Sequence, residues 1–210
     1  MRVEPPSITW TVCEGGLLPN LLRKAGPMLT ELFQKSTLFY LLFKIDRDLS
    51  EQVRKAGCPH CGGNLHYSNY PRKPRGGPNG LPDEYLVRFS LCCDRENCRR
   101  RTLPPSCRFK GRRVYWHGVM LVVMTLRQGL SAGKIAEKFH KLFGMTRNTV
   151  ARWVTWYRDV FPSTSTWRRV RGLIGSTIRN DNLPSDLVTH YIAHSPSRQE
   201  ALIHCLKLLS

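Results

Sequence analysis

Two groups of closely spaced cysteines are the residues of this chain best suited to chemistry. They lie in residues 57–63 (GCPHCGG) and 92–98 (CCDRENC). Pairs at this spacing can surround one zinc ion with four thiolates, and Pro59 with the adjacent glycines favours the tight turn that brings Cys58 and Cys61 onto one metal. Four thiolates leave no open position for a substrate, so the sequence predicts a structural zinc ion rather than a catalytic one.

The third zinc ligand has to be chosen between two adjacent cysteines. On a strand the side chains of Cys92 and Cys93 point to opposite faces, so only one of them should bind the metal. We favour Cys93, because it forms the tighter loop with Cys98. His60 or His66 could replace one of the cysteines, and this alternative stays open. The predicted ligands of one structural Zn²⁺ are Cys58, Cys61, Cys93 and Cys98.

The chain is strongly basic. Lys and Arg number 33 against 15 Asp and Glu, which gives a formal net charge of +18 and a pI of about 10.1. Nucleic acid is the commonest polyanion that needs such a charge, and an anionic membrane is the second. The charge therefore indicates a polyanionic partner.

Many of the basic residues gather directly after the second cysteine group. Residues 99–113 (RRRTLPPSCRFKGRR) contain six arginines, one lysine and no acid. If the metal holds this segment, its guanidinium groups could lie along a phosphate backbone with little loss of entropy. The alternative is an ordinary solvated face. The predicted phosphate contacts are Arg99, Arg100, Arg101, Arg108, Arg112 and Arg113.

Glycines and hydroxyl residues divide the next part of the chain into three predicted helices. Residues 113–129 form an apolar helix that ends at a glycine. Ser131 caps a second helix from residue 132 to about 142. Thr146 caps a third helix over residues 147–161.

The spacing of the second and third helices predicts a helix-turn-helix. The small Ala136 lets the two helices cross closely, and Val150 with Trp153 anchors the third helix to the core. The outward residues at the start of the third helix would then reach base edges in a major groove. The alternative is a three-helix core without groove contact. The predicted base contacts are Arg147, Asn148, Thr149 and Arg152.

The expected fold class is α+β, mainly α. Residues 1–56 form an N-terminal helical arm, and residues 57–112 form a zinc ribbon with a basic extension. Residues 113–162 form the helix-turn-helix domain, and residues 163–210 form C-terminal helices that close it. A zinc ribbon has almost no apolar core, so its metal would supply most of its stability, on the order of 10 kcal/mol.

Local patterns predict the elements that hold the site. The apolar stripe predicts a helix over residues 28–56, interrupted by a polar turn at residues 46–48, after which Ser50 caps a short final helix. Proline and glycine predict an irregular loop over residues 70–82, and alternation predicts a strand over residues 85–93.

The order of these parts resembles a known architecture. A zinc ribbon, an arginine-rich segment and a helix-turn-helix, in CPHCGG … RFSLCCDRENCRRRTLPPSCRFKGRRVY and the helices up to about residue 160, resemble the DNA-binding half of insertion-sequence transposases and the bacterial proteins encoded beside mobile elements. Transposases of this kind continue into a catalytic domain with an acidic triad, for which the last fifty or so residues are too few. The resemblance therefore implies a non-catalytic DNA-binding protein of a mobile element, an accessory or regulator of a transposase or recombinase.

Two other functions remain open from the sequence. The ribbon could be an RNA-binding module, or residues 28–56 could recruit a partner within a transposition complex. No apolar run approaches the roughly 20 residues that cross a bilayer, and the first residues lack the apolar core of a signal peptide. We therefore expect a cytoplasmic, nucleoid-associated protein without a membrane partner. No phosphate-binding glycine loop, nucleophile elbow or paired carboxylate site predicts an enzyme.

Overall fold

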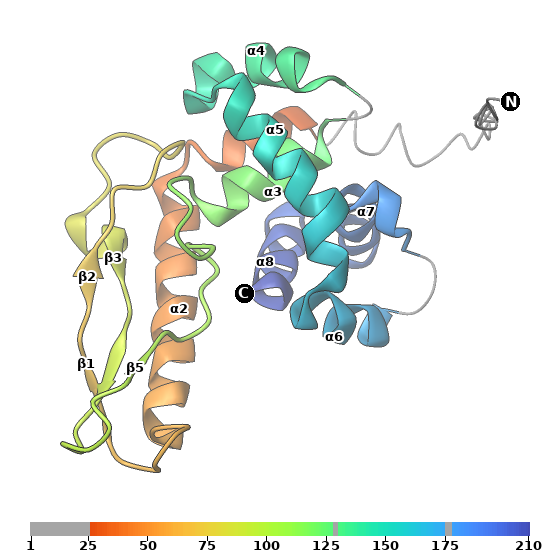
Figure 1. Cartoon of the computed structure of the whole chain (residues 1–210). Helices are drawn as coiled ribbons and strands as arrows, with labels where there is room; N and C mark the ends of the chain where they lie inside the picture. The colour runs from red at the N-terminus through yellow and green to blue at the C-terminus, as the bar shows by residue number, and fades with distance from the viewer. Residues whose placement is uncertain (1–25, 128–129, 175–177) are drawn as a thin grey trace, which may run out of the picture.

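The long helix α2 (Ser36–Ala56) separates two parts of the molecule in Figure 1. The computed structural model describes residues 26–127, 130–174 and 178–210. A ribbon of short strands, residues 57–103, lies along one side of α2, and a group of helices, residues 115–210 and called here the helical half, lies along the other (Figure 1). The expected α+β, mainly α class is confirmed. Part of the expected arm, residues 1–25, lies outside the described residues.

Helix α2 is continuous, so the predicted break at residues 46–48 is wrong. Residues 26–32 are helical as well, and a short turn separates them from α2. Asp46 and Ser50 both point inward from α2 and are buried. The Ser50 hydroxyl donates to the backbone carbonyl of Arg47 within the same helix instead of capping a new one. Polar residues in a buried helix face look like a turn in the sequence because their partners lie far along the chain.

The ribbon consists of two small antiparallel sheets. Three strands, β1 (Leu65–Tyr67), β4 (Leu91–Cys93) and β5 (Arg101–Thr102), pair in the order β1-β4-β5. The other two, β2 (Tyr70–Pro71) and β3 (Val87–Arg88), pair with each other.

The single strand predicted over residues 85–93 is wrong. A 3₁₀ turn at Asp83–Leu86 precedes β3, and residues 89 and 90 separate β3 from β4. The Ser90 backbone N–H donates to the side-chain oxygen of Asn69 instead of to a neighbouring strand. The residues around Ser90 are buried consecutively rather than alternately, so the alternation that predicted one half-buried strand is absent here.

Helix α3 (His117–Thr125) is the centre of the core. All of its residues are buried, and it contacts α4 (Ala132–Phe143), α5 (Arg147–Thr155), α7 (Ser185–His194) and α8 (Arg198–Leu209). It is shorter than the predicted helix over 113–129, because residues 113–116 are not helical and Tyr115 pairs with Arg75 in an isolated bridge. The predicted end at Gly129 lies outside the described residues.

The remaining helical segments complete the shell around α3. After α5 the chain continues through a π-helical turn at Trp156–Val160 and a 3₁₀ turn at Phe161–Ser163. Helix α6 (Ser165–Ile174) and a 3₁₀ turn at Asn180–Asn182 follow. None of the helices in the described ranges combines the length and the apolarity that a bilayer crossing requires.

The glycine-rich loop of the ribbon reaches across to the helical half. The Arg75 backbone N–H donates to the Val114 carbonyl (2.7 Å), and the Trp116 N–H donates to the Arg75 carbonyl (3.2 Å). Gly77 lies against the Trp116 indole so closely that a Cβ there would come within 2.5 Å of Nε1. The loop predicted to be irregular is therefore part of a defined contact between the two parts of the molecule.

Candidate metal centre and basic clefts

Four cysteine sulfurs converge at the end of the ribbon. The Sγ atoms of Cys58, Cys61, Cys93 and Cys98 all lie within 4.8 Å of one another. Cys58 and Cys98 are 3.7 Å apart, and Cys61 and Cys93 are 3.4 Å apart, measured between Sγ atoms. A zinc–sulfur distance of about 2.3 Å in a tetrahedron requires sulfurs roughly 3.8 Å apart. The cluster therefore has the composition and the size of a Cys₄ zinc site.

Backbone hydrogen bonds shape both loops of the cluster. The Cys58 N–H donates to the Gly63 carbonyl and the Gly62 N–H donates to the Cys58 carbonyl, both at 2.8 Å. Gly62 has φ = 68°, a left-handed conformation that glycine adopts without strain. In the second loop the Cys98 N–H donates to the Arg95 carbonyl at 2.9 Å. The turn predicted around Cys58 and Cys61 is thus held by backbone hydrogen bonds, and so is the loop that ends at Cys98.

The electrostatics of the cluster favour a cation. The pKa of the Cys58 thiol is lowered to about 7, mainly because the His60 backbone N–H donates to its sulfur. Burial raises the pKa of the Cys93 thiol to about 12. Deprotonated sulfurs packed this closely repel one another, and a divalent cation between them would offset both that repulsion and the loss of solvation.

The structure separates the cluster from the alternative ligands. The Cys92 thiol contacts the Arg99 carbonyl, 3.5 Å away, and is half-buried on the other face of β4. His60 and His66 are exposed; His60 contacts the Arg100 guanidinium, and His66 lies 3.8 Å from the Asp94 carboxylate. The preference for Cys93 over Cys92 agrees with this arrangement.

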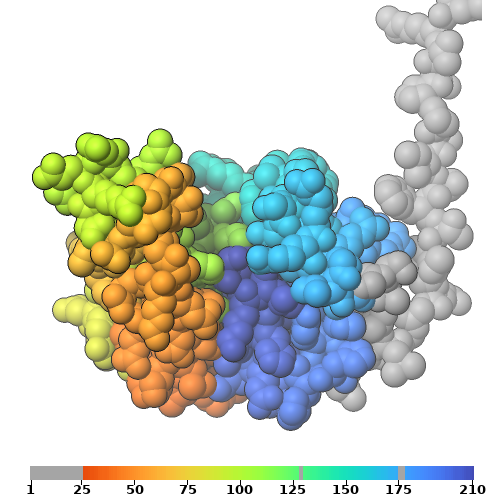
Figure 2. Space-filling model, turned by 90° about the horizontal axis from the view of Figure 1, so that it is seen from below, coloured from red at the N-terminus to blue at the C-terminus, as the bar shows by residue number. Residues whose placement is uncertain are grey.

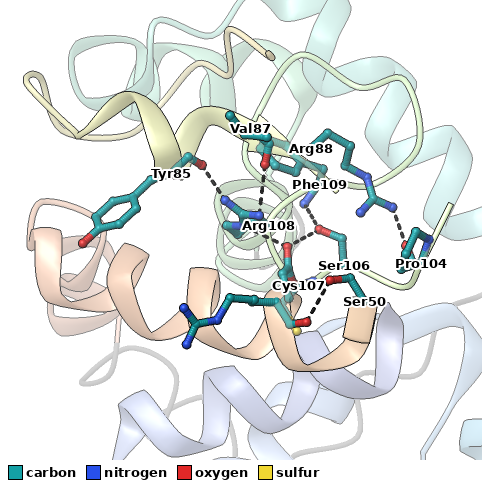
Figure 3. Close-up of polar contacts among 11 residues, drawn as sticks. Ser50, Tyr85, Val87, Arg88, Pro104, Ser106, Cys107, Arg108 and Phe109 are labelled. Atoms are coloured by element: carbon teal, nitrogen blue, oxygen red, sulfur yellow. Dashed lines mark hydrogen bonds and ion pairs between the residues drawn. The ribbon is translucent and has the colours of Figure 1, made fainter. Parts of the chain in front are cut away.

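Arg108 is not a surface residue, so its predicted phosphate contact is wrong. Its guanidinium Nε donates to the Asp46 carboxylate at 2.8 Å, and both side chains are fully buried. It also donates to the Tyr85 and Val87 carbonyls, as Figure 3 shows. The other Asp46 oxygen accepts from the Cys107 backbone N–H at 2.6 Å. We call these residues the Asp46–Arg108 cluster.

Aromatic rings enclose the Asp46–Arg108 cluster. The Arg108 guanidinium lies 5.0 to 5.2 Å from the ring centroids of Phe43, Phe89 and Phe109. These rings come from α2, from the ribbon and from the segment before α3. The cluster therefore joins α2 to the ribbon and fixes the start of the helical half.

Helices α4 and α5 lie where the second and third predicted helices are expected, and they pack against each other. The Ser131 hydroxyl accepts from the Lys134 N–H and the Thr146 hydroxyl accepts from the Thr149 N–H, so both predicted N-caps are confirmed. Gly144 ends α4 with φ = 62°, the left-handed C-cap expected there. Val150 and Trp153 are buried against the core. The third helix, however, is α-helical only to Thr155 and then changes to the π-helical turn.

The outer face of α5 forms a ridge between two clefts. Ala151 and Thr155 line both of them, so these two residues mark the crest. The first cleft, about 760 Å³, lies between α5 and residues 112–115. In Figure 2 the surface is hollowed between the ribbon and the cyan α5–α6 region. The second cleft, about 510 Å³, lies between α5, the start of α4 and residues 181–185, with Arg127 and Asp181 in its wall.

The predicted base contacts lie on or near this ridge. Arg147, Asn148 and Arg152 are exposed, and Thr149 is half-buried with its hydroxyl 3.1 Å from that of Thr146. Arg152 and Thr149 line the first cleft.

The predicted phosphate contacts divide into two places. Arg112 and Arg113 line the first cleft opposite α5. Arg99, Arg100 and Arg101 are exposed at the metal end of the ribbon, which Figure 1 shows far from α5. Arg101 donates to the Ser68 hydroxyl, and Arg99 has a positive φ of 45°, unusual for arginine. Trp156 and Val114 also line the first cleft and Arg127 the second. The sequence did not predict these three as site residues, because their positions in the clefts depend on the tertiary fold.

Comparisons of the chain with protein-family models, with curated proteins and with solved structures give no match.

Proposed function

We propose that this chain is a non-catalytic DNA-binding protein that binds duplex DNA through α4 and α5, with its ribbon held together by one structural zinc ion. The sequence resemblance to the DNA-binding half of insertion-sequence transposases supports a bacterial mobile element as its setting. It would act there as an accessory or regulator of a transposase or recombinase, in the cytoplasm with the nucleoid.

The observation that carries the proposal is the ridge of α5 between two clefts. A major groove about 12 Å wide admits one helix, and the phosphate backbones of the two strands then pass on either side of it. The two clefts offer room for those backbones. Arg112 and Arg113 line the first cleft and would bring positive charge to one phosphate strand. Arg127 lines the second cleft, where the Asp181 carboxylate offsets part of its charge.

The cysteine cluster would serve this function indirectly. Cys58, Cys61, Cys93 and Cys98 would hold the ion, whose bound state supplies charge neutralisation and a rigid link between the two loops. The loops then carry Arg99, Arg100 and Arg101 in fixed positions as further phosphate contacts.

The two alternatives have less support. An RNA-binding ribbon would leave the ridge of α5 and its two clefts without a role. The apolar side of α2 is buried between the ribbon and the helical half, which leaves little of it for recruiting a partner.

Selection of bound sequences from a random duplex pool tests the proposal. We expect enrichment of a defined sequence with the wild type and loss of that enrichment with Arg152→Ala. Arg47→Ala is the matched control, because Arg47 is an exposed arginine on α2, away from both clefts. A pool that stays random for the wild type, or an equal effect of the two variants, would refute sequence-specific binding by α5.

Salt dependence gives a second readout. Each phosphate contact that is removed lowers the slope of log affinity against log salt by about one. Arg112→Ala should therefore weaken binding to all duplexes and reduce this slope, without changing which sequence is selected.

A further inference from the structure

Arg113 is a cation without an anionic partner in a partly buried place. Among the residues that the structure describes, its side chain makes neither a hydrogen bond nor an ion pair. Its guanidinium lies over the face of Trp156, 4.4 Å from the ring centroid. Burial lowers the pKa of Arg113, and the nearby Tyr157 offsets part of this effect. A partly desolvated guanidinium of this kind can still donate hydrogen bonds to a ligand and stack on a planar group.

Trp156 packs against two neighbouring aromatic rings as well as against this guanidinium. Its ring packs against Tyr157 at 4.8 Å and Phe161 at 5.1 Å between centroids. It is also the first residue of the π-helical turn that interrupts the helix after Thr155. Such turns occur frequently at functional sites. Arg113 and Trp156 thus form a stacked pair on one wall of the first cleft.

The rest of the first cleft combines apolar walls with a basic rim. Val114 and Val160 line it with 53% and 45% of their surface exposed. Arg112 and Arg152 add positive charge, and the hydroxyls of Thr149 and Thr155 add hydrogen-bonding groups; the lining residues include no carboxylate. Phosphate alone would not need apolar walls, and an acidic peptide would not need a planar stacking surface.

We propose that the first cleft binds one unpaired nucleotide of a DNA strand, with its base stacked on the Arg113–Trp156 pair and its phosphate against Arg112 and Arg152. This inference rests on the proposed function, because the duplex held by α5 would bring one strand past the mouth of the cleft. A paired base stays in the helix, whereas an unpaired base turns out at the smallest energetic cost. The protein would therefore prefer duplexes that carry a bulge, a mismatch or a single-stranded end.

The magnitude of this preference can be estimated. Stacking of a base on an aromatic side chain contributes about 1–3 kcal/mol, and the same range for the stack on Arg113 and Trp156 corresponds to an affinity ratio of roughly 5- to 150-fold. Arg guanidinium planes stack on bases as well, so a ladder of Trp156, Arg113 and base uses both interactions.

The test compares two probes that differ by one nucleotide. The first is a duplex with the selected sequence, and the second is the same duplex with a single 2-aminopurine bulge beside the bases nearest Arg152. Fluorescence anisotropy gives the affinity ratio of the two probes, and the 2-aminopurine emission reports stacking. With the wild type we expect the bulged probe to bind about 5- to 150-fold more tightly, with quenched emission.

Two variants connect the preference to the cleft. Trp156→Leu removes the aromatic plane, and Arg113→Lys keeps the positive charge while removing the planar group. Both should lower the affinity ratio towards one and restore the emission, and circular dichroism checks that each variant is folded. Arg100→Ala is the control, because Arg100 is exposed at the metal end of the ribbon and outside this cleft, so loss of its phosphate contact should weaken both probes alike.

The outcomes separate this inference from the proposed function. If the wild type binds the duplex but shows no preference for the bulge, the inference is overturned and the duplex-binding proposal stands. If neither probe binds, both proposals fail. A preference that survives in both folded variants would place the unpaired nucleotide outside this cleft and overturn the inference as well.

Discussion

The ribbon and the helical half obtain their order from different sources. The ribbon has a small apolar cluster made of Cys58, Leu65, Leu91 and Cys93, so half of its members are metal-binding candidates. The larger cluster extends from Leu29 to Leu209 and centres on α3, in which every residue is buried. The comparison indicates that burial of apolar surface stabilises the helical half, whereas the ribbon needs its cysteine cluster.

Removal of the metal should reveal the largest difference between the ribbon and the helical half. Structural zinc sites contribute on the order of 10 kcal/mol to the folding of small modules. We expect chelation, or Cys61→Ser, to abolish amide-exchange protection in residues 57–103 while α3 stays protected. Metal analysis and hydrogen exchange measure both effects.

Cys92→Ser is the control for this experiment, because Cys92 lies beside the cluster and outside it. Purified protein without a bound metal, or a ribbon that stays protected after chelation, would contradict the assignment.

The Asp46–Arg108 cluster tests how firmly the two parts are joined. Asp46→Leu or Arg108→Met leaves one fully buried charge without its partner, which should lower the free energy of unfolding by about 3–5 kcal/mol. The double variant removes both charges and should lose much less than the sum of the two changes. Urea unfolding of the three variants gives the coupling energy; additive losses would show that the pair does not act as a unit.

His117 tests the interior of the helical half. It is fully buried, and neither ring nitrogen has a hydrogen-bond partner among the described residues. Burial, helped by the charges of Lys110 and Arg113, lowers its pKa well below the usual 6.5. The unfolded chain therefore binds a proton near pH 6.5 that the folded chain does not. The contribution of His117 to the free energy of unfolding is therefore fully present above pH 6.5. It is lost as the pH falls below 6.5, by up to about 1.4 kcal/mol per pH unit.

His117→Leu should remove this part of the pH dependence. Denaturant unfolding of wild type and variant between pH 7 and 5 measures the difference, and contributions from other groups cancel in the comparison. His204→Leu, at an exposed position of α8, is the control. Parallel curves for the wild type and His117→Leu would show that the ring is protonated in the folded protein.

The smallest expected effect concerns the turn between α4 and α5. Thr146→Ala removes the hydroxyl that caps α5 and should lower the free energy of unfolding by about 1 kcal/mol. Thr146→Ser keeps the cap and should behave like the wild type. Thermal unfolding distinguishes them; equal melting temperatures for all three would show that the cap does not stabilise the fold.

The sequence predicted the features that depend on neighbouring residues. The N-caps at Ser131 and Thr146, the C-cap at Gly144 and the loops around Cys58 and Cys61 each need only a few adjacent residues, and the structure contains all of them.

Features that depend on distant partners were not predictable. In the sequence Arg108 looks like the other arginines of residues 99–113, and only its contact with Asp46 on α2 makes it a core residue. Asp46 itself resembles part of a turn for the same reason. The first cleft depends in addition on how residues 112–115 lie against α5, which no local sequence pattern specifies.

The backbone bonds between Arg75 and the chain at Val114 and Trp116 have a consequence for how this architecture can be recombined. A foreign ribbon transplanted between α2 and α3 would supply its own cysteines but would lack the glycine that fits the Trp116 indole. Such a chimaera should orient its new ribbon loosely even with a full complement of metal. In chains with this architecture, the ribbon and the helical half should therefore be inherited together, as a single unit of exchange.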